Sequence, residues 1–141
     1  IEEAAGMSLG EIFATHGEAY YHQLERESIS ALLASSYGCV LAPGGSVVAD
    51  GESWALIKRR CFTVWLHATP AEFMRRMRRQ GDLRPMQGRP SAMDELKALL
   101  GRREPFYAES RLKIATTNKS PAAVVTHIVK VVSGPRKKRA A

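Results

Sequence analysis

Two groups of residues in this sequence could bind an anion or a hydroxyl group: a pair of glycines and a set of arginines. Residues 40–50 read VLAPGGSVVAD, so Gly44, Gly45 and Ser46, which we call the glycine corner, follow a short apolar run. Bare backbone N–H groups at such a corner can approach an anion without a Cβ in the way. A glycine pair also suits an ordinary turn, so the sequence leaves both interpretations open.

The arginines are concentrated in one internal stretch, because residues 74–89 contain six arginines and one aspartate. Guanidinium groups bind phosphates and carboxylates through paired N–H donors, so we expect this stretch to lie near a phosphate. A second basic run carries four positive charges within residues 135–139. Such a run is typical of a solvated, disordered tail, which would cover residues 134–141, and nucleic-acid binding is the alternative.

The composition limits the class of protein. A chain of 141 residues with 45% hydrophobic residues can build one sizeable core, which predicts a single domain. The two cysteines, Cys39 and Cys61, lie in apolar segments and predict reduced core thiols, while the four histidines have no zinc-binding spacing. We expect no metal site. Without a run of roughly 20 apolar residues or a signal peptide, the sequence predicts a soluble, cytoplasmic protein with no membrane partner.

Helices and strands alternate along the chain. Ser8 and Glu11 have the spacing of a capping box, and Thr69-Pro70 and Ser120-Pro121 are typical of helix starts. The patterns predict helices over about 9–17, 18–35, 52–59, 70–80 and 121–132, a helix that opens at about residue 91, and strands over 39–42, 61–66 and 113–117. Residues 81–90 are predicted as a polar loop.

This alternation predicts a parallel sheet joined by right-handed crossovers, hence an α/β domain. Three strands are fewer than the roughly five of a typical sheet. The chain also opens inside a helical pattern at Ile1, without a cap or an initiator methionine, so we expect a fragment of a longer protein. Ligands bind beyond the carboxyl ends of parallel strands, where the glycine corner is expected to lie.

Four motifs in order make this sequence similar to a known family. They are the segment from Ser8 to Glu25, the glycine pair after a strand, Arg84-Pro85, and the run Arg103-x-Pro105-x-Tyr107. Together they resemble the shikimate kinases, small members of the P-loop kinase fold. The resemblance implies a three-layer parallel sheet with helices on both faces, truncated at its N-terminus. It implies one domain over residues 1–133, with a mobile lid at about 80–90.

The resemblance also implies a ligand site. The positions that correspond to an acid-binding pocket are Phe13, Tyr21, His22, Gly44, Gly45, Ser46 and Arg103, and Arg84 would lie on the lid over phosphates. Other interpretations remain open, since Phe13 and Tyr21 could be core residues on amphipathic helices and Arg103 could face water.

Three departures from the family pattern bear on function. The family has a carboxylate-binding arginine where His22 stands. The histidine lacks the planar guanidinium that can donate two parallel hydrogen bonds to a carboxylate. It has a third glycine where Ser46 stands. In the family, the phosphate-binding P-loop and the acidic residues that bind metal and act as the base precede the position of Ile1. We therefore assign no catalytic residue and expect this chain not to bind ATP in that way.

Residues 77–86 are similar to a branch of bacterial helix-turn-helix regulators whose shikimate-kinase-like C-terminal domain responds to benzoyl-CoA. Our main prediction is therefore the effector-binding domain of a transcriptional regulator of aromatic acid catabolism, with an aryl-CoA or acid ligand, and enzymatic activity is left open. DNA would be bound by a domain outside this chain, and a homodimer is left open. The alternative is a fragment of an active shikimate kinase that uses ATP and Mg²⁺ to phosphorylate shikimate.

Overall fold

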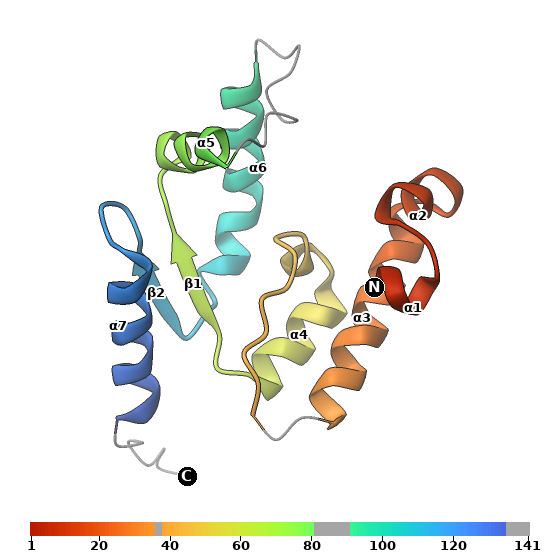
Figure 1. Cartoon of the computed structure of the whole chain (residues 1–141), viewed down its shortest axis with the longest axis horizontal. Helices are drawn as coiled ribbons and strands as arrows, with labels where there is room; N and C mark the ends of the chain where they lie inside the picture. The colour runs from red at the N-terminus through yellow and green to blue at the C-terminus, as the bar shows by residue number, and fades with distance from the viewer. Residues whose placement is uncertain (36–37, 81–90, 135–141) are drawn as a thin grey trace. The chain divides into compact units, whose positions relative to one another are not determined.

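The computed structural model describes residues 1–35, 38–80 and 91–134 (Figure 1). Their elements, in chain order, are α1 (Glu2–Ala5), α2 (Leu9–Thr15), α3 (Gly17–Ser35), the 3₁₀ turn η1 (Val47–Ala49), α4 (Gly51–Arg60), β1 (Val64–His67), α5 (Pro70–Arg79), α6 (Ala92–Tyr107), β2 (Leu112–Ala115) and α7 (Pro121–Ser133). None of the helices in these ranges is long and apolar enough to cross a bilayer.

The chain forms two compact units. The first unit comprises Ile1–Thr63 and Arg103–Arg111, and the second comprises Val64–Arg102 and Leu112–Ala141. The last turn of α6 therefore belongs to the first unit and the rest of that helix to the second.

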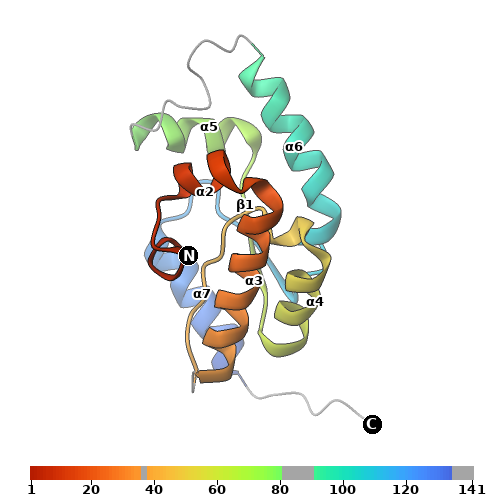
Figure 2. The same cartoon turned by 90° about the vertical axis from the view of Figure 1, so that its right-hand side faces the viewer.

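The first unit is built from helices that begin where the local sequence predicts. At the start of α2, the Ser8 side chain accepts a hydrogen bond from the Glu11 N–H while the Glu11 carboxylate accepts one from the Ser8 N–H, which makes a complete capping box. Helices α3 and α4 lie side by side (Figure 2). Their core is a cluster of buried side chains, Ile29, Val47, Val48, Trp54 and Ile57. Both valines of the cluster directly follow the glycine corner, so the core anchors the corner at its C-terminal end.

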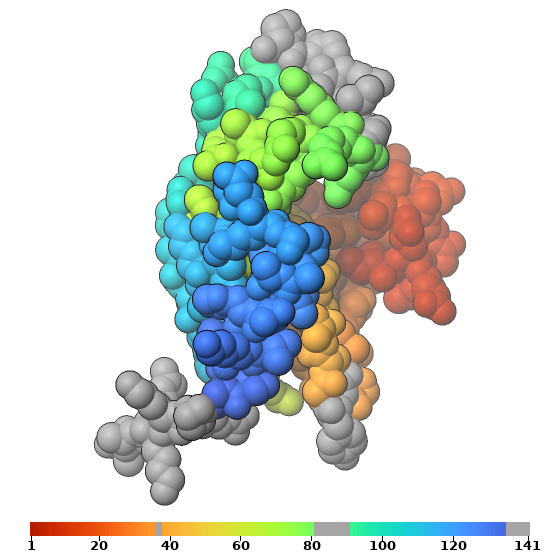
Figure 3. All heavy atoms as spheres, turned by 60° about the vertical axis from the view of Figure 1, so that its left-hand side comes forward, coloured from red at the N-terminus to blue at the C-terminus, as the bar shows by residue number. Residues whose placement is uncertain are grey.

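The second unit contains a two-stranded parallel sheet. Strands β1 and β2 pair from Val64 with Leu112 to His67 with Ala115. Thr69 caps α5 and Ser120 caps α7, each with proline in the first turn, as predicted. Helix α7 lies on the surface of this unit (Figure 3), where Val125, Val129 and Val132 remain about half exposed. The predicted α/β class with parallel pairing is confirmed.

The predicted strand over residues 39–42 is wrong. These residues are extended but pair with no strand among the described residues, and Val40 is fully exposed. An apolar run becomes a strand only when a neighbour satisfies its backbone groups, and local sequence does not reveal that neighbour. The second strand begins at Val64 rather than Cys61, because the Cys61 N–H caps α4 by donating to the Ile57 carbonyl.

Candidate functional site

The glycine corner is a hydrogen-bonded turn. The Val47 N–H donates to the Gly44 carbonyl over 3.1 Å, and η1 follows directly. Positive φ angles among the described glycines occur at Gly6, Gly17 and Gly38, and so not at Gly44 or Gly45. These two positions therefore do not need glycine for its left-handed conformation. The surrounding side chains give a different reason.

Gly44 lies against polar groups of α3. A methyl group added there would lie 3.4 Å from both Glu25 Oε1 and the Tyr21 hydroxyl, and 3.7 Å from Ser46 Oγ. The absence of a side chain lets three oxygen atoms approach one stretch of backbone. A ligand at this position would meet hydroxyl and carboxylate oxygens beside the exposed main chain of the corner.

Gly45 lies against the last turn of α6. The Tyr107 hydroxyl donates a 2.7 Å hydrogen bond to the Gly45 carbonyl. A methyl group at Gly45 would lie 3.3 Å from that hydroxyl and 3.6 Å from Arg103 Nη1. Arg103 is half-buried, whereas its neighbour Arg102 is exposed. The fold thus brings a guanidinium to a glycine pair that is distant in sequence, an arrangement suited to a carboxylate.

Phe13 and Tyr21 form an aromatic wall between α2 and α3. Their rings stack with centroids 5.0 Å apart. Phe13 remains 47% exposed, so it is not a core residue, and Tyr21 is half-buried. Burial, followed by the negative charge of Glu25, raises the pKa of the Tyr21 hydroxyl. The phenol therefore stays protonated at neutral pH and can donate a hydrogen bond.

His22 lies between two carboxylates of its own helix. Its Nδ1 is 3.4 Å from Glu25 Oε2 and its Nε2 is 3.5 Å from Glu18 Oε1. Glu25 is only 3% exposed, which is unusual for a carboxylate. Sequence reasoning missed Glu25 as part of this group. The spacing of three residues after His22 on a predicted helix was the available signal.

A cavity of about 220 Å³ borders this group in the first unit. Tyr21, Glu25 and Gly44 form part of its wall, and apolar side chains such as Ile29, Leu32 and Leu41 form much of the rest. An apolar hollow with a few convergent polar groups is the usual form of a small-molecule site.

The second unit has its own pocket, of about 450 Å³, after the carboxyl ends of its two strands. Thr116 follows β2, and Arg76 reaches it from α5 with Nη1 3.1 Å from Thr116 Oγ1 and Nη2 2.9 Å from the Thr116 carbonyl. The Glu72 carboxylate accepts hydrogen bonds from both Arg75 and Arg76, which hold the pKa of Glu72 below its usual range. The pocket is lined by Leu66, Ala68, Phe73, Arg76, Met77, Gln80 and Thr116.

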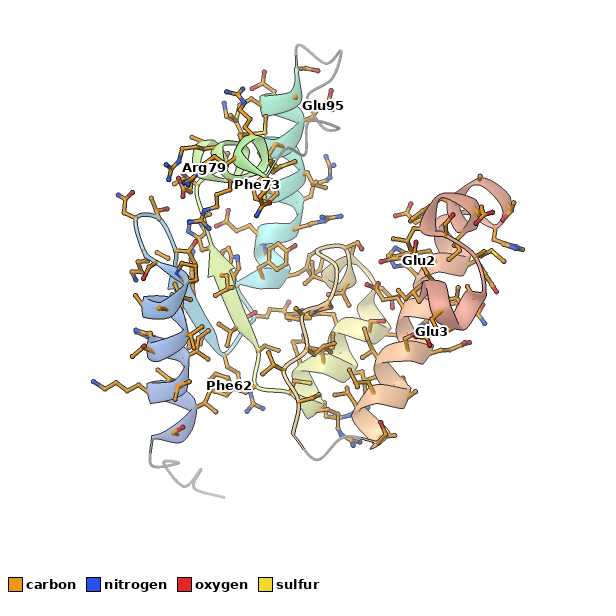
Figure 4. All side chains as sticks on the ribbon, in the orientation of Figure 1. Glu2, Glu3, Phe62, Phe73, Arg79 and Glu95 are labelled. Carbon is orange, nitrogen blue, oxygen red and sulfur yellow. The ribbon has the colours of Figure 1, made fainter. Side chains whose placement is uncertain are left out.

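Arg76, which lines this second pocket, was predicted only as one of the six arginines in residues 74–89 and not as an individual site residue. Phe73 and Arg79 project from the same helix, α5 (Figure 4). Arg84, the arginine that was singled out, lies with residues 81–90 outside the described residues, so the proposed lid stays a prediction. The basic tail at residues 135–141 is also outside them.

Comparison with known proteins identifies the family. The model of the family described as shikimate kinase matches residues 1–133. The shikimate kinase of Parasynechococcus marenigrum (strain WH8102) is 36% identical over 132 residues, which are 94% of this chain and 68% of that protein. The shikimate kinase of Geobacter metallireducens (strain ATCC 53774 / DSM 7210 / GS-15) is 36% identical over 134 residues, covering 95% of this chain and 74% of that one.

Solved structures agree with the sequence matches. The crystal structure of shikimate kinase from Aquifex aeolicus vf5 has a TM-score of 0.78 at 30% identity and covers 94% of this chain and 76% of that chain. The shikimate kinase from Acinetobacter baumannii in complex with shikimate has a TM-score of 0.81 at 24% identity, over 97% of this chain and 76% of that chain. These matches confirm the predicted shikimate-kinase-like α/β fold.

The prediction of a regulator domain is wrong. The relatives are named as kinases, which contradicts the predicted roles in transcription and the DNA and aryl-CoA partners, benzoyl-CoA included. His22 and residues 77–86, on which the regulator prediction rested, do not distinguish a regulator from a kinase. A histidine in place of an arginine at position 22 removes one guanidinium that could bind a carboxylate through two hydrogen bonds. The Arg103 guanidinium, however, remains beside Gly45.

Proposed function

This chain belongs to the shikimate kinase family, and we propose that it is the acid-binding and nucleotide-contacting part of an enzyme that phosphorylates shikimate with ATP. In such a reaction an acceptor hydroxyl oxygen bonds to the γ-phosphorus as the bond to the β–γ bridging oxygen breaks, and the hydroxyl proton is lost. The observation that carries the proposal is the position of the Arg103 guanidinium beside Gly45.

The first unit supports acid binding. The Arg103 charge can pair with a carboxylate, and the exposed backbone of Gly44 and Gly45 can approach ring atoms closely. The Tyr21 and Ser46 hydroxyls lie near Gly44, where they can hydrogen-bond ring hydroxyl groups. Phe13 would cover an apolar side of the acid. In this proposal these side chains bind and orient the acid but do not themselves transfer the phosphoryl group.

The second unit supports a nucleotide contact. Its pocket follows the carboxyl ends of parallel strands, the usual place for ligands in such sheets. Arg76 is held by Glu72 and Thr116, so its planar guanidinium is fixed in one orientation, suited to stacking on a base or pairing with a phosphate. Arg84 is proposed to contact phosphates from the lid.

Neither a P-loop motif in the sequence nor a metal-binding group among the described residues is present. The 141 residues contain no Gly-x-x-x-x-Gly-Lys-Ser/Thr run, and the described ranges hold no group of three or more His, Cys, Asp or Glu side chains suited to a metal ion. We therefore assign no catalytic residue and no magnesium ligand to them. The proposal also includes a kinase domain over residues 1–133. It places the protein in the cytoplasm, which contains ATP and is reducing, so that Cys39 and Cys61 stay free.

The test is a coupled assay of ADP release with shikimate and ATP, made on the product of the complete natural reading frame. Shikimate-dependent turnover is expected. Arg103→Ala should raise the KM for shikimate about tenfold or more, because a charge-assisted hydrogen bond to a carboxylate is lost. Arg102→Ala removes the same charge from an exposed neighbour and should change little. Absence of shikimate-dependent ADP release, or equal effects of the two variants, would contradict the proposal.

A further inference from the structure

Tyr107 connects two parts of the proposed acid site that are far apart in sequence. Its hydroxyl donates to the Gly45 carbonyl across 62 residues of sequence, at 2.7 Å. The side chain is half-buried and packs against the core cluster that includes Val47 and Val48. The ring is therefore held from one side while the hydroxyl reaches the glycine corner.

Arg103 and Tyr107 are four residues apart on α6, so both side chains project from one face of the helix. Both reach Gly45, since a methyl group there would lie 3.6 Å from Arg103 Nη1 and 3.3 Å from the Tyr107 hydroxyl. One helical turn thus supplies a cation and a hydrogen-bond donor to the same residue.

The glycine corner needs such a constraint because two consecutive glycines have wide conformational freedom. Two backbone hydrogen bonds close the turn, from the Val47 N–H to the Gly44 carbonyl and from the Ala49 N–H to the Ser46 carbonyl, and neither of them reaches Gly45. The Tyr107 bond fixes the carbonyl of the Gly45–Ser46 peptide. Because a peptide is planar and trans, fixing that carbonyl also fixes the direction of the Ser46 N–H on the opposite side.

The segment that follows Tyr107 is anchored as well. The Lys58 ammonium of α4 forms an ion pair with the Glu109 carboxylate, whose pKa this partner lowers. The Arg111 N–H donates to Thr63 Oγ1 over 3.0 Å. These contacts hold the backbone around Tyr107 in place, so its hydroxyl can restrain the more flexible glycine pair.

We propose that Tyr107 is a positioning residue whose hydroxyl holds the glycine corner at a fixed separation from the Arg103 guanidinium. The backbone and the guanidinium then form one preformed surface for the carboxylate of the acid. The identity of that acid rests on the proposed function, whereas the constraint on the glycine corner does not.

The first experiment needs no ligand. Amide hydrogen exchange is compared in the natural protein, Tyr107→Phe and Tyr20→Phe, the last a matched loss of hydroxyl from a tyrosine whose ring lies against His16. Exchange at Gly45, Ser46 and Val47 should become about fivefold faster in Tyr107→Phe, the factor expected for one hydrogen bond. It should stay unchanged in Tyr20→Phe. Equal exchange in all three proteins would overturn the proposal.

The second experiment measures kinetics with shikimate and ATP. Tyr107→Phe should raise the KM for shikimate about fivefold, with kcat within about twofold and an unchanged KM for ATP. A loss confined to kcat, or equal changes in both KM values, would contradict a positioning role. If the natural protein shows no turnover, the proposed function fails, and the exchange measurement alone still decides the role of Tyr107.

A double-mutant cycle separates the hydroxyl from simple packing. Gly45→Ala places a methyl group 3.3 Å from the Tyr107 hydroxyl, so it should disturb the same hydrogen bond. The effects of Gly45→Ala and Tyr107→Phe on exchange at Ser46 should therefore be non-additive, with the double variant close to the stronger single one. Fully additive effects would show that the two groups act independently and would overturn the proposal.

Discussion

His22 and Arg103 offer a carboxylate different kinds of partner. Arg103 brings a permanent charge and a planar set of donors to the side of Gly45. His22 has a smaller ring, and both of its nitrogens already face carboxylates, Glu25 at 3.4 Å and Glu18 at 3.5 Å. In the proposed acid site, Arg103 would therefore be the stronger contact for a carboxylate and His22 the weaker one.

We predict that His22→Arg strengthens binding of the acid. A guanidinium at this position could accept Glu25 as a partner and still present a second pair of donors to a carboxylate. The KM for shikimate should fall about fivefold. His16→Arg, a change at an exposed histidine that ends α2, is the control and should leave the KM unchanged. An unchanged or higher KM in His22→Arg would mean that position 22 does not face the acid.

Helix caps determine much of the structure at the scale of single elements. Asp50 caps α4 through a hydrogen bond from the Ser53 N–H, and it lies 3.7 Å from Arg26. Burial alone would raise the pKa of Asp50, but the hydrogen bonds from Ser53 and the charge of Arg26 outweigh it and lower the pKa. The carboxylate therefore stabilises the folded state wherever it is ionised.

We predict that Asp50→Ala lowers the free energy of unfolding by about 1 kcal/mol at pH 7, the usual effect of losing an N-cap. Because the folded-state pKa is depressed, this contribution is present above the unfolded pKa of about 3.9 and is lost as pH falls through the lower folded value. Urea unfolding at pH 7 and at acid pH checks this. Asp94→Ala, which removes an exposed carboxylate near Lys97, should cost less at pH 7.

We predict that Glu72→Gln disorders the pocket of the second unit. The neutral amide loses its charge-assisted bonds to Arg75 and Arg76, so Arg76 is held less firmly against Thr116. The KM for ATP should rise and the melting temperature should fall at pH 7. Since the Glu72 pKa is lowered, the difference in melting temperature should vanish as pH falls through that folded pKa.

The exposed Glu3→Gln serves as the control for Glu72→Gln and should change neither quantity. A KM for ATP that is unaffected by Glu72→Gln would remove the reason to place the nucleotide beside Arg76. Thermal unfolding over a pH series distinguishes the electrostatic contribution of Glu72 from any change in packing, because a packing defect would persist at low pH.

At the scale of the whole molecule, the core of the first unit supports the proposed site. Ile57 packs in the cluster with Val47 and Val48, which follow the glycine corner. We predict that Ile57→Ala lowers the free energy of unfolding by about 3 kcal/mol, through lost burial and a residual cavity. It should also raise the KM for shikimate, because the corner loses support.

Urea unfolding followed by tryptophan fluorescence provides the measurement, since Trp54 lies in the same cluster. Val129→Ala, on the half-exposed side of α7, is the control and should change the free energy of unfolding by no more than about 0.5 kcal/mol. Similar effects of the two variants would mean that the cluster is not the core of the first unit.

The sequence by itself determined the features that depend on neighbouring residues. The capping box of Ser8 and Glu11, the caps at Thr69 and Ser120, the extents of most helices and the parallel α/β class were all predicted correctly. These features form through hydrogen bonds that reach three or four residues along the chain, or through a regular spacing of apolar side chains. The shikimate-kinase-like fold was also recognised from ordered motifs.

Only the tertiary structure decided which distant residues meet. It showed residues 39–42 without a strand partner among the described residues, Glu25 beside Gly44, and Arg76 bound to Thr116 across 40 residues. The kinase family, rather than a regulator, was established by comparison over nearly the whole chain, whereas His22 and residues 77–86 had indicated the wrong choice. A strand, a buried carboxylate and a binding site all depend on partners far along the chain, and those partners become neighbours only when the backbone folds.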